Sequence, residues 1–171
     1  YRNNCSEITD MEDIISKKSF KLTPNINKNK ILKKLESTPK GFGIPGEFFS
    51  NQDIFDIEME YIFHNEWVFA GHEVQLQEKG TWFTMNVGKN PILVIKGDNN
   101  EIKAYHNICR HRGLKLCEGN TGKLDTKNIM CDYHNWTYDI NDGSLKKARD
   151  MEKNNSCGEF CPEQFGLFPV H

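Results

Sequence analysis

The sequence predicts an α+β protein that is mainly β, in which a small antiparallel β domain follows an N-terminal arm and one or more helices. Short runs rich in aromatic and β-branched residues alternate with turn signals from residue 75 onward. Apolar residues recur at helical spacing before that point. The sequence has no internal repeat and no parallel βαβ pattern, so we expect an antiparallel domain that presents two loops at one end.

Residues 1–48 form the predicted N-terminal arm. This segment is polar, rich in Lys and Asn, and interrupted by Pro24 and Pro39. Helical turns are expected over residues 11–17 and 28–36, the second because its apolar residues recur at helical spacing. The lysines of that second segment are expected to form a solvated helix face and not a docking site.

Residues 49–70 are expected to contain a helix that leads into the β domain. A capping pattern, Ser50 followed by Asp53, marks its start after the glycine-rich loop at 41–46. The apolar residues that fall on one face at a period of about 3.6 residues are Ile54, Phe55, Met59, Ile62, Phe63 and Trp67. The pattern predicts a helix that ends at Trp67.

Residues 71–171 form the predicted β domain. Turn sequences at 88–91 and 97–100 separate its first strands, and a Gly turn at 141–143 closes a later hairpin. The expected strands are 82–87, 91–96, 101–106, 128–130, 136–140 and 144–146. The third and fourth of these strands each lead into a loop that carries Cys and His.

Composition and charge exclude several classes of protein. The chain has 22 Lys and Arg against 24 Asp and Glu, so its net charge is −2 and nothing predicts a nucleic-acid partner. The aliphatic run at 92–95 is far shorter than the roughly 20 residues that cross a bilayer, and no secretory leader opens the chain. We expect a cytoplasmic protein with no membrane association, whose free thiols are Cys5, Cys117, Cys157 and Cys161.

The residues that carry chemistry lie in two short motifs. Cys109-Arg110-His111 and Cys131-Asp132-Tyr133-His134 each offer one thiol and one imidazole from a separate loop. A Rieske centre is a [2Fe-2S] cluster in which two imidazoles replace two thiolates on one iron. We expect the two cysteines to bind the inner iron and the two histidines to bind the outer one. Since neutral imidazoles remove negative charge, such a cluster accepts electrons at about −150 to +300 mV.

Structural zinc is the alternative metal that two cysteines and two histidines could bind. Common zinc modules pair Cys with Cys and His with His, at spacings such as C-x2–4-C and H-x3–5-H. Here each pair combines one Cys with one His, and Arg-Gly and Trp-x-Tyr flank the pairs. This pairing favours iron over zinc.

The full motifs, 109–113 (CRHRG) and 131–138 (CDYHNWTY), resemble the Rieske domain of the ring-hydroxylating oxygenase α subunits, the Rieske non-haem iron oxygenases. The family pattern is C-x-H-R-G and C-P-Y-H-G-W-x-Y/F, so this chain departs at Asp132 and Asn135. Neither departure touches a ligand. Asn tolerates the left-handed conformation well, so we expect Asn135 to keep the turn that Gly would make. The Asp132 carboxylate is expected to lower the potential of the cluster.

Respiratory Rieske proteins resemble the chain less closely. Each of their cluster loops carries an extra cysteine, the two forming a disulfide, and a serine hydroxyl binds a cluster sulfur. The residues at those positions here are Leu114, Tyr133 and Trp136. Fewer hydrogen bonds to the sulfurs stabilise the reduced cluster less, so we expect a potential in the lower part of the Rieske range.

The resemblance implies the electron-entry part of an NAD(P)H-dependent oxygenase, either a dioxygenase or a monooxygenase. A flavin reductase, a ferredoxin or both would deliver electrons, and a mononuclear Fe(II) would activate O2 for hydroxylation or demethylation. Two His and one carboxylate hold such an iron, and this grouping is not formed by His64, His72, His106 and His171. We therefore expect no catalytic residue in this chain and a catalytic domain that would follow residue 171. A homotrimer or an α3β3 assembly is also implied.

Two alternatives remain open. A stand-alone Rieske ferredoxin, which is an electron carrier, would have the same cluster loops, but the N-terminal arm and the helix ending at Trp67 resemble the oxygenases and favour them. The substrate class also stays open, because similar loops occur in oxygenases of aromatic rings and of quaternary amines.

Overall fold

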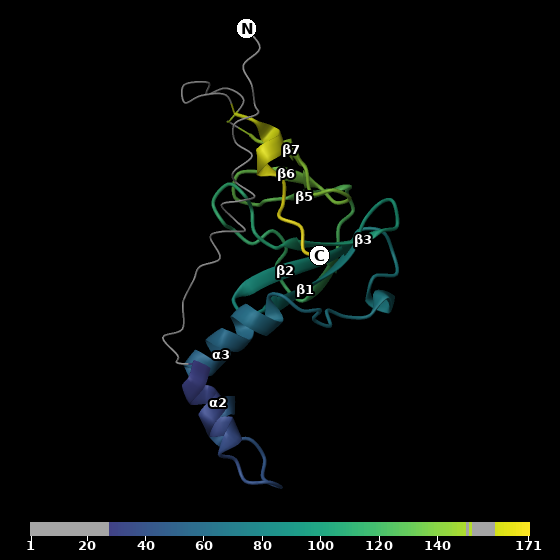
Figure 1. Ribbon diagram of the computed structural model, residues 1–171. Helices are drawn as coiled ribbons and strands as arrows, with labels where there is room; N and C mark the ends of the chain where they lie inside the picture. The colour runs from purple at the N-terminus through teal and green to yellow at the C-terminus, as the bar shows by residue number, and fades with distance from the viewer. Residues whose placement is uncertain (1–27, 150, 152–159) are drawn as a thin grey trace. The chain divides into compact units, whose positions relative to one another are not determined.

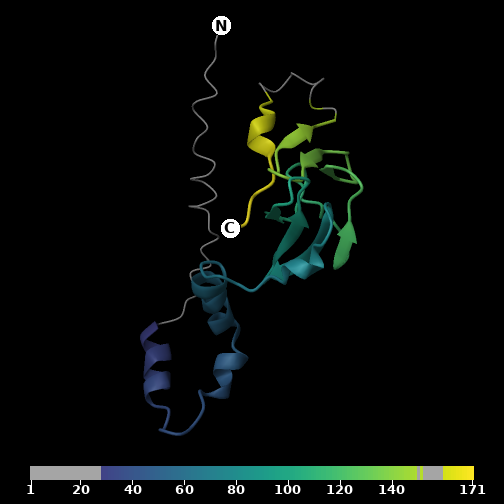
Figure 2. The ribbon, with the colours of Figure 1, turned by 90° about the vertical axis from the view of Figure 1, so that its right-hand side faces the viewer.

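The computed structural model describes residues 28–149, 151 and 160–171. The chain divides into two compact units, one that ends at Glu66 and one that begins at Trp67. Figure 1 shows the helices of the first unit and the strands of the second, and Figure 2 shows the same ribbon from the side. None of the described helices is long and apolar enough to cross a membrane.

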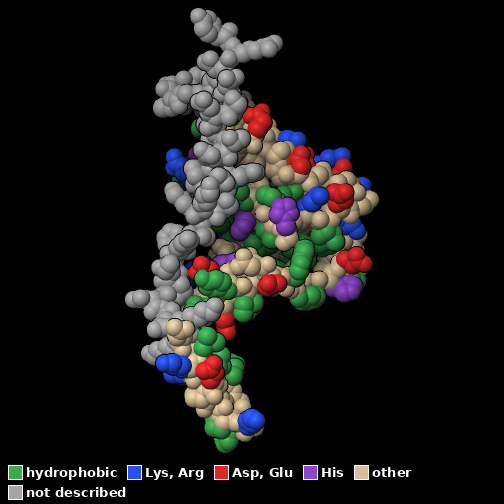
Figure 3. Space-filling model, in the orientation of Figure 1, with side chains coloured by type: hydrophobic (Ala, Val, Ile, Leu, Met, Phe, Trp, Pro, Cys, Tyr) green, Lys and Arg blue, Asp and Glu red, His purple; other side chains and the backbone are tan. Residues whose placement is uncertain are grey.

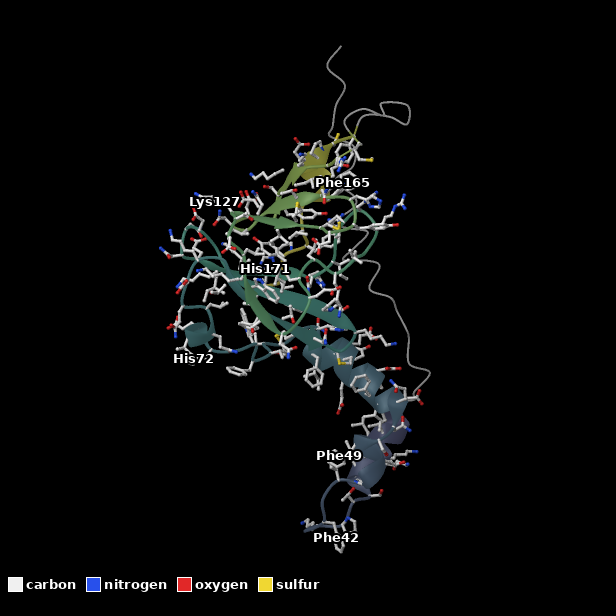
Figure 4. The ribbon with its side chains drawn as sticks, turned by 180° about the vertical axis from the view of Figure 1, so that it is seen from behind. Phe42, Phe49, His72, Lys127, Phe165 and His171 are labelled. Carbon is white, nitrogen blue, oxygen red and sulfur yellow. The ribbon has the colours of Figure 1, made fainter. Side chains whose placement is uncertain are left out.

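The first unit contains short helices, and no side chain whose burial is described in it is fully buried. Helix α2 (Lys28–Glu36) confirms the helix predicted there, and a 3-10 turn, η2 (Gly46–Phe49), follows it. Phe42 and Phe49 are 75% and 78% exposed (Figure 4). The helix predicted at 11–17 lies outside the described residues.

Helix α3 (Gln52–Glu58) begins one residue later than the capping pattern predicts. Asn51 is its N-cap, and Asn51 Oδ1 accepts the N–H groups of Asp53 at 2.9 Å and Ile54 at 3.3 Å. The prediction of Ser50 as the cap is therefore wrong. The amide of Asn51 provides the acceptor that the first turn needs, so the Ser hydroxyl is not required.

The predicted continuation of this helix to Trp67 is also wrong. A π-turn, η3 (Met59–Phe63), follows α3, and His64 N–H donates to Met59 O at 3.0 Å. The wider turn ends the helix at Phe63, and Trp67 lies beyond it with 91% of its surface exposed. In the second unit, a 3-10 turn, η4 (Glu73–Gln75), precedes the first strand.

The first sheet has four antiparallel strands in the order β3-β2-β1-β4. These are β1 (Thr81–Val87), β2 (Asn90–Lys96), β3 (Ile102–His106) and β4 (Thr121–Lys123). The first three strands confirm the predictions. The sequence does not predict β4, because Gly122 at its centre carries no strand signal. Gly122 lies against the indole of Trp82, where a Cβ would come within 2.3 Å of Trp82 Cζ2.

The second sheet has three antiparallel strands in the order β5-β6-β7. These are β5 (Asn128–Met130), β6 (Thr137–Asp139) and β7 (Leu145–Lys147). They confirm the predicted strands, with the hairpin strands shorter or shifted by a residue. The hairpin turn requires glycine, because Gly143 has a φ of 72° and a Cβ there would lie 2.7 Å from the Tyr105 ring.

Two hydrophobic cores lie on opposite faces of the first sheet. The larger core joins the two sheets and includes Leu93 of β2 and Tyr138 of β6, both 0% exposed. The smaller core lies on the other face and includes Phe83 of β1. Cys109 and Cys131 both belong to the larger core, so the packing between the sheets also positions the bases of the two loops.

The C-terminal segment runs back along β3. It begins with a 3-10 turn, η6 (Pro162–Phe165). Phe168 O then accepts the N–H of His106 at 2.9 Å. The segment can be followed in Figure 4 between the labelled Phe165 and His171.

We expect Gly80→Ala to destabilise the second unit more than Gly119→Ala. Both glycines have positive φ, 78° and 91°, which costs about 1–2 kcal/mol for a residue with a Cβ. A Cβ at Gly80 would also lie 2.3 Å from Leu124 O, whereas nothing lies within 4 Å of one at Gly119. The collision should add about 1–3 kcal/mol to the loss of unfolding free energy, measured by urea denaturation. Equal losses in the two variants would contradict this account.

Candidate metal centre

The first loop (109–114) follows β3 and forms a closed turn. Cys109 N–H donates to Leu114 O at 2.8 Å, and Gly113 N–H donates to Cys109 O at 2.9 Å. Gly113 has a φ of 76°, the left-handed conformation that lets the chain reverse within so few residues.

The second loop (131–136) follows β5 and repeats this skeleton. Cys131 N–H donates to Trp136 O at 2.8 Å, and Asn135 N–H donates to Cys131 O at 2.9 Å. Asn135 has a φ of 57°, which confirms that it keeps the left-handed turn. The loops differ in the place of the imidazole, which follows the cysteine by two residues in the first loop and by three in the second.

Asn107 closes the base of the first loop. Its side chain is buried, and Oδ1 accepts the N–H groups of Leu116 at 3.1 Å and Cys117 at 3.0 Å. Its Nδ2 donates to Cys117 O at 2.8 Å. A buried amide left without partners costs about 1–3 kcal/mol, so these bonds hold the two ends of the loop together.

The structure brings the predicted ligands together in two pairs. Cys109 and Cys131 are each 2% exposed and belong to the same core. The imidazole rings of His111 and His134 have centroids 4.7 Å apart and are only half-buried. The thiols therefore face the core and the imidazoles face the surface. Figure 3 shows one face of the molecule, on which hydrophobic and charged side chains both reach the surface of this unit.

Aromatic rings fix the orientation of both imidazoles. The buried indole of Trp136 stacks on His111 with centroids 4.8 Å apart and planes 7° apart. Trp136 in turn meets Phe165 edge-on at 5.7 Å. The ring of Tyr133 lies 3.8 Å from that of His134. Each imidazole is thus held by an aromatic residue of the second loop.

Burial and neighbouring charge shape the protonation of the site. Burial, followed by His134 and Arg112, lowers the pKa of His111, which favours the neutral imidazole that binds metals. Burial and the neighbouring Cys109 thiol raise the pKa of Cys131, although two backbone N–H groups of the second loop act in the opposite direction. Two thiolates side by side in this place need a cation between them, and a bound metal supplies one.

The donor atoms fit a two-iron cluster. Nδ1 of His134 is buried without a hydrogen-bond partner among the described residues, and a metal bound there would satisfy it. Structural zinc takes four ligands at one ion, whereas the mixed cluster takes two protein ligands at each iron. The pairing of one Cys with one His in each loop favours the cluster over zinc.

Tyr138 is a residue of the site to which the motifs gave no role. Its hydroxyl lies 3.2 Å from Cys109 Sγ and accepts the N–H of Arg110 at 3.0 Å. Because the oxygen accepts from Arg110, its own proton is available to the sulfur. Burial, with Cys109 adding to it, raises the pKa of Tyr138, so the hydroxyl stays a donor at neutral pH.

The hydroxyl of Tyr138 bears on the expected potential. The expectation of a low value rested on Trp136 standing in place of a serine, and it left this hydroxyl out. The sequence does carry a signal for this hydroxyl. The family pattern allows Tyr or Phe at this position, and the chain has Tyr138, which carries the hydroxyl that Phe lacks. A hydrogen bond to a ligand sulfur stabilises the more negative, reduced state and raises the potential.

The remaining cysteines are not members of the two ligand motifs. Cys117 is a free thiol, as expected, and Cys161 is half-buried, whereas Cys5 and Cys157 lie outside the described residues. Burial, with a contribution from Asp132, raises the pKa of Cys117 to about 11. Cys117 is therefore protonated at neutral pH and a poor metal ligand compared with a thiolate.

Comparison with known proteins identifies the domain. The family model of the Rieske [2Fe-2S] domain matches residues 66–161. The chain belongs to the Rieske [2Fe-2S] domain family. The strands and both loops of the second unit fall within the matched region, so this unit is the Rieske domain of the chain.

The Rieske domain and its flanks are similar to oxygenase subunits. The chain is 38% identical over 136 residues to the glycine betaine monooxygenase oxygenase subunit of Pseudomonas aeruginosa, which covers 80% of this chain and 30% of the relative. It is 36% identical over 104 residues to the toluate 1,2-dioxygenase subunit alpha of Pseudomonas putida, covering 61% of this chain and 22% of that one. The chain therefore spans less than a third of the length of these relatives.

Two solved structures have the same fold. A quaternary ammonium Rieske monooxygenase matches with a TM-score of 0.67 and 31% identity, covering 74% of this chain and 35% of the other. Naphthalene 1,2-dioxygenase from Rhodococcus sp. matches with a TM-score of 0.69 and 28% identity, covering 82% of this chain and 31% of the other. These matches confirm the mainly β fold with antiparallel sheets.

We expect Tyr138→Phe to retain the cluster and to lower its reduction potential. The variant removes the hydroxyl proton from Cys109 Sγ, and a bond to a charged group contributes about 1.5–3 kcal/mol. If roughly half of that differs between the redox states, the potential falls by about 30–65 mV for one electron. A spectroelectrochemical titration measures it. Tyr133→Phe is the control, because Tyr133 is 56% exposed, and equal potentials in the two variants would refute the role of Tyr138.

Proposed function

We propose that this chain is the electron-transfer part of an oxygenase α subunit. Cys109 and Cys131 hold one iron of a [2Fe-2S] cluster in this proposal, and His111 and His134 hold the other. The observation that supports it is the pair of matching loops, whose two thiols are buried and whose two half-buried imidazole rings have centroids 4.7 Å apart. Membership of the Rieske family supports the same assignment.

The residues around the cluster divide the work of electron transfer. When bound, the cluster supplies a one-electron redox couple at about −150 to +300 mV. Cys109 and Cys131 exclude water from the inner side, since both are buried. His111 and His134 reach the surface, where a free ring nitrogen can hold a proton and donate a hydrogen bond to an electron acceptor. Electrons would therefore cross the surface at the imidazoles.

The partners of this site are part of the proposal. Electrons would come from NADH or NADPH through a flavin reductase, a ferredoxin or both. They would pass to a mononuclear Fe(II) in a catalytic domain, within a homotrimer or an α3β3 assembly. The similarity to oxygenase subunits supports these partners. The shared region is only 30% of the betaine monooxygenase subunit, so most of that relative lies outside the shared region.

For the complete enzyme we favour oxygenation of a quaternary ammonium compound, with hydroxylation leading to demethylation. The betaine monooxygenase subunit aligns with 80% of the chain, whereas the toluate dioxygenase subunit aligns with 61%. Hydroxylation of an aromatic ring is the alternative. The mononuclear iron and the substrate pocket of either enzyme would lie outside the Rieske domain.

A stand-alone Rieske ferredoxin is the second candidate function. A carrier needs only the β domain, but the similarity to the betaine monooxygenase subunit spans 136 residues and is longer than the Rieske match at 66–161. The shared region outside the β domain favours the oxygenase.

We expect Cys131→Ser to abolish the cluster and Cys117→Ser to leave it intact. Both thiols are buried, at 2% and 6% exposure, so the two variants remove the same kind of group from the same core. Visible absorption and the iron and sulfide content of the purified chain measure the outcome. Loss of iron from Cys117→Ser alone would show that the ligand assignment is wrong, and a colourless native protein containing zinc would overturn the cluster itself.

We expect the chain with its cluster to take up about one electron, as a [2Fe-2S] centre does. An anaerobic titration with dithionite, followed by visible absorption and electron paramagnetic resonance, counts the electrons. His134→Cys should retain iron but lower the potential, because a thiolate adds negative charge to the outer iron. An unchanged potential in that variant would contradict the role of His134.

A further inference from the structure

Arg110 lies between Cys109 and His111, and its side chain contacts the C-terminal segment. Its guanidinium donates to Gly166 O at 2.8 Å and, over a longer distance of 3.5 Å, to Gln164 O. These contacts connect the first loop to a segment more than fifty residues away in the sequence.

The guanidinium also lies over the ring of Phe168, with Cζ 3.6 Å from the ring centroid. The side chain is half-buried, and its partners among the described residues are two backbone carbonyls and an aromatic ring. These groups stabilise a cation without cancelling its charge. Arg110 therefore keeps a full positive charge in a partly dry position.

This charge is connected to a cluster ligand through Tyr138. The backbone N–H of Arg110 donates to the Tyr138 hydroxyl, which is bonded to Cys109 Sγ. Arg110 also follows Cys109 directly in the chain, so its guanidinium is held within one side-chain length of the first loop. Reduction adds one negative charge to the cluster, and a fixed cation nearby stabilises that state more than the oxidised one.

We propose that Arg110 sets the reduction potential of the cluster, acting as a fixed positive charge that the C-terminal segment holds in place. This inference rests on the proposed cluster site. It goes further by assigning an electrostatic role to a residue that binds no iron. The two carbonyls and the Phe168 ring hold the guanidinium in one position, so its effect on the reduced state is constant.

A purely structural role for Arg110 makes a different prediction. If the side chain only fastens the C-terminal segment, replacing it would change the unfolding free energy, and any change in the potential would be as large with lysine as with a neutral residue. If its charge acts on the cluster, a neutral replacement lowers the reduction potential. Lysine keeps the positive charge, so Arg110→Lys should stay close to the potential of the native chain.

The test compares the native chain with Arg110→Gln, Arg110→Met and Arg110→Lys, each loaded with iron and sulfide. The neutral variants are expected to decrease the equilibrium constant for reduction about tenfold, which is about 59 mV for one electron. Spectroelectrochemical titration measures the shift. Lys103→Gln is the control, since Lys103 at the far end of β3 carries the same charge, is partly exposed and pairs with Glu101.

The outcomes separate this inference from the proposed function. A native chain that binds no cluster would refute the cluster site itself. The role of Arg110 would be overturned, with the cluster site left standing, by either of two results. One is a neutral variant that holds the cluster at the potential of the native chain, and the other is an equal shift in Arg110→Gln and Lys103→Gln. If both neutral variants lose the cluster, Arg110→Lys decides, because a tenfold decrease there would place the effect in the contact with the C-terminal segment and not in the charge.

Discussion

The arrangement of the site depends on the closure of two backbone turns. In each loop the amide of the cysteine bonds to a carbonyl five residues ahead, and a left-handed residue four positions after the cysteine returns a bond to the cysteine carbonyl. These bonds orient the thiols inward, where both lie at 2% exposure. The larger core and the Asn107 amide then fix the bases of the loops.

Much of the β domain could be predicted from the sequence because its signals are local. Turn residues and β-branched runs mark most of the strands, and the Cys and His pairs mark both loops. The left-handed Asn135 followed from the Gly of the family pattern and from the conformational preference of Asn. The family match at 66–161 supports the same reading of the motifs.

Two of the features that sequence reasoning missed depend on contacts between distant residues, and a third depends on a local π-turn. Strand β4 has Gly122 at its centre and exists because that residue fits against Trp82. The helix was extended to Trp67 because apolar spacing continued, although a π-turn ends it at Phe63. The Tyr138 hydroxyl reaches Cys109 only after two separate loops have packed together. The spacing of apolar residues along a chain carries no information about contacts between residues that are far apart in the sequence.

The shared skeleton of the two loops has a consequence for how such sequences diverge. A substitution leaves the count of residues between the cysteine and the left-handed position unchanged, so Asp132 and Asn135 can replace the usual Pro and Gly. An insertion or deletion between Cys131 and Asn135 would move the left-handed residue out of register and open the turn. Evolution is therefore free to vary the composition of these loops, while their length is held constant by geometry.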